Sequence, residues 1–318
     1  MLRLFRIDNG LIKEMDVSPD TLATDLDRAD WIDAHEPEED ERPLLEKLLS
    51  TDVPELDEME EIEASARCFV DQAGIHVHSL FLTQSEGRHV TISVACILQR
   101  GRLITIREDD VADFRLMRMR ARRGQVEAGS PSDLLVTLFE QKMENHADTL
   151  EDLHRELEQV SHRVLEGDDG DDLYTAISDL ANLEDSNGKM RLCLMDSQRD
   201  ISFLLRHMRP TPEQSDTLRE IMRDIETLMS HTTFLFDKVN FLMDSTQGFI
   251  NIRQNQIIKI FSIAAVVFLP PTLVASIYGM NFKVMPEMDW ALGYPMAIGL
   301  MIMAGLAPYL YFKKKGWL

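Results

Sequence analysis

Gly279, Met280 and Asn281 lie between two apolar stretches, and Asn281 could meet a cation without holding it tightly. Its side chain presents a neutral amide oxygen. Mg²⁺ gives up its water shell reluctantly, so an amide can hydrogen-bond to the waters of the hydrated ion. A carboxylate at this position would bind more strongly and would retain the ion. By itself the tripeptide is a weak signal, because loops often contain glycine and asparagine.

The stretches on either side, Ile260–Tyr278 and Trp290–Phe312, carry no charged residue. About 18 apolar residues suffice to cross a bilayer, so the two predict a transmembrane hairpin. Arg253 and Lys259 precede the first span and three lysines, 313–315, follow the second. The positive-inside rule then predicts cytoplasmic termini and a loop on the far side. The first residues lack an apolar signal-peptide core, so no cleavable signal is expected.

A long helix is predicted to lead into the first span. Thr211 offers an N-cap, Pro212 suits the first turn and Gln214 suits the third position. Apolar or small residues then recur at alternating steps of three and four, which predicts one helix from about Pro212 to Tyr278. The antiparallel helices of the same chain could cover this seam, or copies of the helix in other subunits could. Its continuation into the membrane favours the copies. The seam comprises Leu218, Ile221, Ile225, Leu228, Thr232, Leu235, Val239, Leu242, Thr246 and Phe249.

Past Phe249 the same spacing brings polar residues onto one stripe, with apolar residues between them. Such a stripe can pack tightly against another helix in lipid, or it can line a pore whose apolar rings gate by dewetting. Pro270 and Pro271 free two backbone carbonyls, which a wet pore or a packed neighbour could satisfy. Gly279 is expected to end the helix in a left-handed conformation. The polar members are Asn255, Ser262, Thr272 and Ser276, and the apolar ones are Ile258, Phe261 and Leu269.

The first part of the chain mixes strand and helix signals, and after Ser130 the strands disappear. Alternating apolar residues predict strands at Met1–Ile7, Ala29–Asp33, Ala73–Leu82, Val90–Leu98 and Arg102–Arg107. Helices are predicted at Pro37–Ser50, Asp113–Arg123, Ser130–Leu165 and Leu173–His207. The fold class is therefore an α+β cytoplasmic domain with a long stalk helix and two C-terminal transmembrane helices. The expected divisions are an α/β domain (1–128), an antiparallel helical pair with an acidic tip at Gly167–Asp172 (129–210), a stalk helix (211–256), a first transmembrane helix (257–278), a loop with Gly-Met-Asn on the far side (279–290), a second transmembrane helix (291–312) and a basic tail (313–318).

The chain is strongly acidic, with 55 Asp and Glu against 33 Lys and Arg and a formal net charge of −22. Such a surface repels nucleic acid and attracts divalent cations, although solubility alone is the plainer explanation. Cys68, Cys96 and Cys193 are isolated from one another, which suits a reducing compartment and argues against a structural zinc site.

Enzyme chemistry has no support in the motifs. The sequence contains no P-loop, no glycine-rich dinucleotide turn and no nucleophile elbow. His76 and His78 share one face of a strand at a spacing that can ligate metal. A pair of surface histidines is the simpler interpretation, and we expect no enzyme activity.

Several segments together resemble the CorA family of magnesium transporters, over essentially the full chain. The central one is Tyr278-Gly279-Met280-Asn281-Phe282, followed by Met285-Pro286-Glu287, between two spans and before a lysine-rich end. The others are Asp57–Ser65, Phe114–Ala121, Arg191–Asp196, Ile257–Ser262, Val267–Ser276 and Ala307–Lys313.

The resemblance implies a funnel-shaped homopentamer in the bacterial inner membrane that imports Mg²⁺ and also passes Co²⁺ and Ni²⁺. It implies that Asn281 selects the hydrated ion and that Gly279 and Met280 shape this mouth. The first span would line the pore. The implied pore-lining residues are Asn255, Ile258, Phe261, Leu269 and Thr272.

Transporters of this family also close their pore when cytosolic Mg²⁺ binds between subunits through acidic residues. An ungapped match through the stalk points to Glu220, with Asp224 one turn later as a rival. In the N-terminal domain, Glu108 and Asp109 are the natural candidates.

Two other functions are compatible with the elements. A zinc transporter of the same superfamily is the nearer, but those proteins resemble Gly-Ile-Asn at the motif, and Met280 speaks against it. A membrane-anchored metal sensor that conducts nothing would need only the hairpin and the stalk, and the polar stripe in the first span disfavours it.

Overall fold

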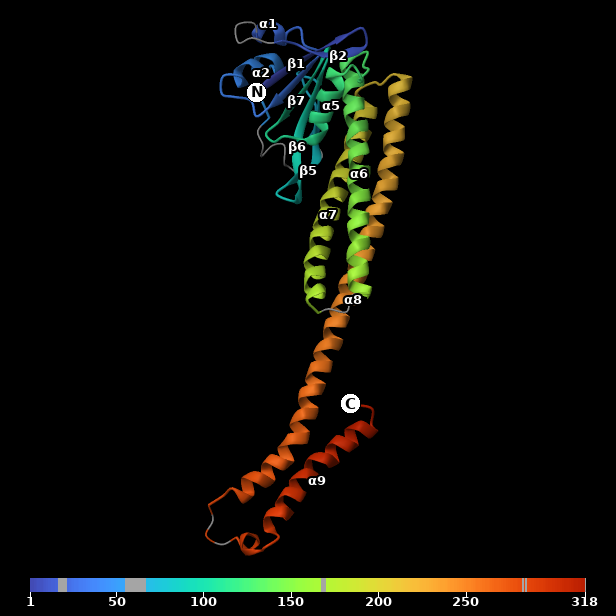
Figure 1. Ribbon diagram of the computed structural model, residues 1–318. Helices are drawn as coiled ribbons and strands as arrows, with labels where there is room; N and C mark the ends of the chain where they lie inside the picture. Colours follow the sequence, from blue (N-terminus) through green and yellow to red (C-terminus); the bar gives the residue numbers. More distant parts are fainter. Residues whose placement is uncertain (17–21, 55–66, 167–169, 282, 284, 318) are drawn as a thin grey trace. The chain divides into compact units, whose positions relative to one another are not determined.

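The computed structural model describes residues 1–16, 22–54, 67–166, 170–281, 283 and 285–317, with the backbone alone at 170–172, 287 and 288 (Figure 1). The chain forms two compact units, Met1–Met243 and Asp244–Leu318. Helix α8, Pro212–Tyr278, is continuous and contributes residues to both units. The predicted single helix is therefore confirmed.

A mixed sheet lies at the centre of the first unit. Its spatial order is β2-β1-β3-β7-β6-β5-β4, and within the described residues only β3 and β7 are parallel. The strands are β1 (Leu2–Asp8), β2 (Leu11–Glu14), β3 (Trp31–His35), β4 (Cys68–Val70), β5 (Ile75–Ser85), β6 (Arg88–Gln99) and β7 (Arg102–Arg107).

Alternating side chains bury both faces of this sheet. In β6, Val94 and Cys96 enter one core, and Ala95 and Ile97 enter the other. The first core is completed by α5 (Ala112–Arg122), α6 (Pro131–Glu166), α7 (Gly170–His207) and part of α8. The second core is completed by α1 (Leu22–Leu26) and α2 (Arg42–Leu49) on the opposite face. Helices thus cover the sheet on both sides, as the predicted α+β domain requires.

The predicted strands and long helices are all present, with ends that differ by a few residues. The largest shift is in α2, which begins at Arg42 rather than near Pro37. The short elements β2, β4, α1 and the 3₁₀ turn Pro286–Asp289 were not predicted. The quoted segment 57–65 and part of the predicted acidic tip, 167–172, lie outside the described residues. The division into seven functional parts stays a prediction.

The apolar seam of α8 is covered within its own chain. Leu218, Ile225 and Leu242 have no exposed surface, and they share one core with apolar residues of α6 and α7. The Asn187 amide of α7 also donates to the Thr232 carbonyl of α8 at 2.9 Å. The preference for copies of α8 as the partners of this seam was wrong. A three-four repeat predicts that a helical face is buried and does not identify the helix that buries it.

Buried polar groups attach α6 and α7 to the sheet. The Lys142 ammonium of α6 donates to the Ser79 hydroxyl of β5 at 2.8 Å, and that hydroxyl donates to Asp200 of α7 at 2.5 Å. All three residues are fully buried. Burial, and then the charge of Asp196, raises the pKa of Asp200 to about 7. A chain of hydrogen bonds in this dry layer fixes the two helices in register with the sheet.

The histidine pair of β5 is buried, so the predicted surface location was wrong. His76 and His78 are each 2% exposed. The edge strand β4, which was not predicted, pairs with this end of β5 and stacks the Phe69 ring on His76 at 4.4 Å. Burial, and then the charge of His76, lowers the pKa of His78 to about 4.

Candidate functional site

The Gly279-Met280-Asn281 tripeptide follows directly on α8. The Gly279 amide donates to the Ala275 carbonyl at 2.9 Å, and the Met280 amide donates to the Ile277 carbonyl at 3.2 Å. Gly279 is absent from the described glycines with positive φ, so the predicted left-handed conformation was wrong. A Cβ at Gly279 would lie 3.1 Å from the Ala275 oxygen, which is closer than most side chains come to a backbone oxygen.

Asn281 has an exposed side chain, and no hydrogen bond joins that side chain to another described residue. Met280 beside it is 47% exposed. The amide of Asn281 is therefore open to a ligand. An uncharged amide suits contact with the water shell of a cation, because it neither strips the shell nor neutralises the charge.

A cavity of about 520 Å³ lies behind the tripeptide, between the end of α8 and the start of α9 (Gly293–Lys314). Small residues from both helices line much of it, among them Ala275, Gly279, Gly293 and Ala297. Further along α9, a Cβ at Gly305 would lie 3.2 Å from Cγ of Pro271. Small residues allow this close approach of two helices, as in membrane proteins generally.

The predicted pore-lining residues share one side of α8. At 100° per residue, positions 255 to 272 of the stripe fall within an arc of about 120°. Ile258, Phe261 and Leu269 are 61%, 72% and 65% exposed in the single chain, and Asn255 and Thr272 are exposed as well. The Thr272 hydroxyl donates to the Phe268 carbonyl of its own helix at 2.7 Å. The most apolar stretches of α8 and α9 are each 6% buried, so the single chain leaves an apolar surface without a cover.

The acidic residues predicted for regulation are not brought together in one chain. Glu108 and Asp109 are exposed just after β7, and Glu220 and Asp224 are exposed on α8. Glu220 pairs with Arg223 at 3.5 Å. Across the described residues, no group of three or more His, Cys, Asp or Glu side chains is arranged to hold a metal ion.

Sequence reasoning missed Glu140 of α6, which lies near Glu220 and Glu144. Burial, and then the charges of Glu144 and Glu220, raises the pKa of Glu140. The signal available in the sequence was the spacing of Glu140 and Glu144, which are one helical turn apart. The proximity of Glu140 to Glu220 of α8 depends on tertiary packing, which a local pattern does not contain.

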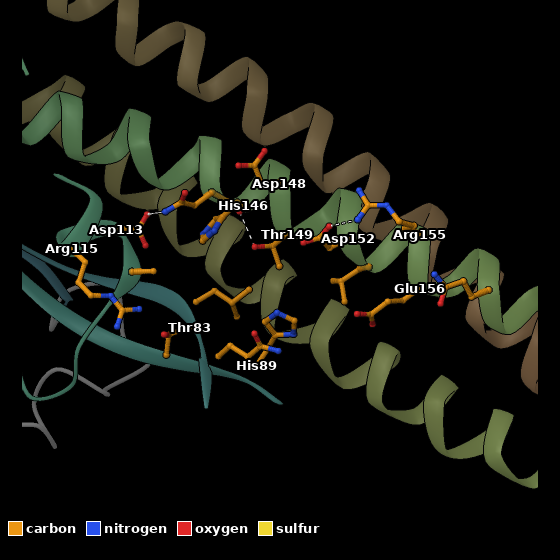
Figure 2. A pocket seen from close by; sticks show the side chains of 16 residues that line it. Thr83, His89, Asp113, Arg115, His146, Asp148, Thr149, Asp152, Arg155 and Glu156 are labelled. Atoms are coloured by element: carbon orange, nitrogen blue, oxygen red, sulfur yellow. Dashed lines mark hydrogen bonds and ion pairs between the residues drawn. The ribbon is translucent and has the colours of Figure 1, made fainter. Parts of the chain in front are cut away.

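A larger cavity of about 820 Å³ lies in the first unit, and it was not predicted (Figure 2). It is formed by β5, β6, α5 and α6, and Asp148, Asp152 and Glu156 follow one face of α6 along it. Asp113 of α5 accepts a hydrogen bond from the Asn145 amide at 2.6 Å, and burial raises its pKa to about 6. The cavity is polar, and its carboxylates are too dispersed for a direct metal site.

Comparison with known proteins agrees with this architecture. The family described as CorA-like Mg²⁺ transporter protein matches residues 27–314. The magnesium transport protein CorA of Escherichia coli strain K12 is 50% identical over 319 residues, which cover 100% of both chains. The protein of the same name from Pectobacterium atrosepticum is 49% identical, again over 100% of both chains.

A solved structure also has the same fold. The complete structure of the CorA magnesium transporter from Methanocaldococcus jannaschii matches with a TM-score of 0.76, at 20% identity, over 100% of this chain and 99% of that one. The mixed sheet, the long α8 with its membrane-length apolar stretch, and α9 are therefore those of a known transporter fold. With its sequence matched from residue 27 to residue 314, the chain belongs to the CorA-like Mg²⁺ transporter family.

Proposed function

We propose that this protein is a channel-like importer of Mg²⁺ in the bacterial inner membrane, working as a homopentamer with both termini in the cytoplasm. The observation that carries the proposal is the 50% identity, over the whole chain, to a protein named for magnesium transport. The two membrane-length helices and the open Asn281 amide supply the physical means.

The selecting step takes place at the periplasmic mouth. Five Asn281 amides around an axis would present oxygens to the waters of an incoming ion, with Gly279 and Met280 shaping the ring. A hydrated Mg²⁺ keeps its shell there, because losing the waters costs more than an amide returns. Because the ring of amides is uncharged, it binds the ion weakly and lets it move inward. The membrane potential drives this movement with about 2.3 kcal/mol per elementary charge per 100 mV.

The proposed conducting path follows the side of α8 that carries the polar stripe. Asn255 and Thr272 contribute polar groups at two levels, and Ile258, Phe261 and Leu269 form apolar rings between them. Apolar rings of this kind close a pore by expelling water from it. These side chains have no cover in the single chain, and in the proposed pentamer other copies of α8 cover them.

Closure by cytosolic Mg²⁺ belongs to the same proposal. Glu108, Asp109, Glu220 and Asp224 are exposed carboxylates, and a site between subunits would draw them from neighbouring copies. Among the described residues of one chain these carboxylates form no metal site, so a regulatory site would need a second subunit. The net charge of −22 favours the accumulation of divalent cations at this surface.

The test is Mg²⁺ uptake by a magnesium-starved strain that depends on this protein. We expect Asn281→Ala to lower uptake by about tenfold or more, because each subunit loses its contact with the hydrated ion. Asn240→Ala, which truncates an exposed asparagine of α8 outside the stripe, is the matched control and should transport normally.

Competition by Co²⁺, Ni²⁺ and Zn²⁺ in the same assay identifies the ion. Inhibition by Co²⁺ and Ni²⁺ at concentrations near those of Mg²⁺ is expected. Uptake of Zn²⁺ in preference to Mg²⁺ would identify a zinc transporter instead. Wild-type protein that conducts no ion in purified bilayers would indicate a sensor.

A further inference from the structure

Arginines gather around one small cavity of the first unit, on a chain that is otherwise strongly acidic. The cavity has a volume of about 350 Å³ and lies between β1 and α5. Five of its six lining residues are arginines, and we call it the arginine pocket. Its lining residues are Arg3, Arg115, Arg118, Met119, Arg122 and Arg123.

Helix periodicity and strand placement together assemble the pocket. Arg115, Arg118 and Arg122 are spaced by three and four residues, so they share one face of α5. Arg3 comes from β1, at the other side of the cavity. Burial is the main cause that lowers the pKa of Arg118, and the charge of Arg3 contributes. Arg3 and Arg118 line the same cavity, although 115 residues separate them in sequence.

Arg118 is held firmly at the base of this cluster. It is 8% exposed, and it donates to the fully buried Asp33 at 2.8 Å. Asp33 also accepts hydrogen bonds from Arg107, which is fully buried. Arg118 and Arg107 thus share the Asp33 carboxylate, which fixes both arginines before any ligand binds.

The carboxylates around the pocket do not balance its arginines. Arg115 pairs with Asp110 at 2.9 Å and Arg122 pairs with Glu14 at 2.6 Å. In the described part of the chain, no carboxylate lies within 4.0 Å of the guanidinium of Arg3 or Arg123. Asp110 also lies 3.7 Å from Arg118. The five arginines of the pocket therefore have three nearby acidic residues, and Asp33 and Asp110 each contact two arginines.

Helix stabilisation does not explain this arrangement. Basic residues in the last turn of a helix interact favourably with its dipole, which accounts for Arg122 and Arg123. Arg115 is in the first turn of α5, where a positive charge opposes the dipole, and Arg3 belongs to a strand. Ion pairs hold Arg115, Arg118 and Arg122, and a ligand with several negative charges would engage Arg3, Arg123 and the remaining N–H donors of the other three.

The ligand chemistry follows from the donors. A guanidinium group presents a planar fork of N–H donors that matches two phosphate oxygens. Arg115 and Arg122 are seven residues apart, or about 10 Å along the helix axis. One phosphate group cannot reach both ends of that row, and a chain of two or three phosphates can. We propose that the arginine pocket binds the polyphosphate chain of a free anion, such as tripolyphosphate or a nucleoside triphosphate.

The experiment uses the purified full-length protein in detergent and measures tripolyphosphate binding by calorimetry, with EDTA present so that bound cations cannot carry the anion. The variant is the double substitution Arg3→Gln and Arg123→Gln. Neither side chain has a carboxylate partner among the described residues, so the change leaves no buried charge uncompensated. We expect the Kd to rise by about tenfold or more, because each charged donor contributes about a factor of ten.

Arg88→Gln with Arg100→Gln is the matched control. It removes the same charge from two exposed arginines outside the pocket and should leave the Kd within about twofold of wild type. Equal weakening in the control would mean diffuse attraction and would overturn the proposal, as would wild-type protein that binds no tripolyphosphate.

Two further probes separate the sources of phosphate. Orthophosphate and a short-chain phosphatidylglycerol each carry one phosphate and should bind at least about tenfold more weakly. Equal affinity for either would assign a single-phosphate site or a lipid headgroup and would refute the polyphosphate ligand. Absent tripolyphosphate binding together with an altered oligomer mass in the Arg3 and Arg123 variant would instead assign the pocket to contact with another copy.

Discussion

His146 of α6 lies in the wall of the large cavity of the first unit with 2% of its surface exposed. Its Nε2 has no hydrogen-bond partner within the described residues. Burial, and then the charge of Lys142, lowers its pKa from 6.5 to about 3. The folded protein therefore keeps this imidazole neutral at a pH where the unfolded chain protonates it. The free energy of unfolding is therefore unaffected by this group above pH 6.5 and decreases as the pH falls from 6.5 toward 3.

We predict that His146→Leu weakens the acid sensitivity of the first unit. Because the folded state keeps this imidazole neutral, the wild-type free energy of unfolding should be about 2 kcal/mol lower at pH 5 than at neutral pH, at 1.36 kcal/mol per pKa unit. Thermal unfolding at pH 5 and pH 7.5 measures this difference, which should narrow in the variant. His231→Leu, at an exposed position of α8, is the control and should leave the pH dependence unchanged. An unaltered pH dependence in His146→Leu would contradict the assignment.

At the level of elements, the packing of α9 on α8 depends on glycine. Gly305 approaches Pro271 and the Val267 carbonyl so closely that a Cβ would lie within 3.2 Å and 3.5 Å of them. Gly299 of the same helix has open space around its Cα in the single chain. The two glycines therefore offer a matched pair on one helix.

We predict that Gly305→Leu destabilises the helix pair by about 1 to 3 kcal/mol, because the added side chain must displace the Pro271 ring or the α8 backbone. Gly299→Leu should cost much less. Thermal unfolding in detergent, followed by far-ultraviolet circular dichroism, compares the two variants. Similar midpoints would show that α8 and α9 do not pack at Gly305.

The long elements could be predicted because their signals are local. The proline at the start of α8 and its apolar repeat locate the helix from Pro212 to Tyr278. Short β2 could have been predicted from Asn9-Gly10, whose positive φ values of 53° and 80° suit a two-residue hairpin turn. Strand β4 has only three residues and depends on its pairing with β5.

The functional sites differ in the same respect, because some can be recognised from adjacent residues and others depend on tertiary contacts. Asn281 is recognisable from four adjacent residues, whereas the arginine pocket joins Arg3 to residues of α5 that are more than a hundred positions away. No local pattern contains such a contact. The histidines of β5 were misplaced for the same reason, since β4 and Phe69 cover them through tertiary pairing.

At the level of the whole molecule, charge and apolar length together predict how the chain crosses the membrane. Lys283 is the one basic residue of the loop, and the last turn of α9 carries Lys313 and Lys314. The three native cysteines are buried, so they should react slowly with thiol reagents.

We therefore predict that Lys283→Cys is labelled on intact spheroplasts by a membrane-impermeant thiol reagent, because the loop faces outward. Trp317→Cys should be labelled only after the membrane is permeabilised. The wild-type protein measures the background from buried thiols. Labelling of Trp317→Cys from outside would reverse the proposed orientation.

The strand order of the mixed sheet also determines how late in translation the first unit can fold. The parallel pairing of Trp31 with Leu103 closes the sheet only after β7 has been made, and its larger face stays open until α7 is completed at His207. At about 5–20 residues per second, that face remains uncovered for on the order of 10 s. The uncovered apolar face makes this interval prone to aggregation, and the apolar stretch 260–278 of α8 is synthesised only after it.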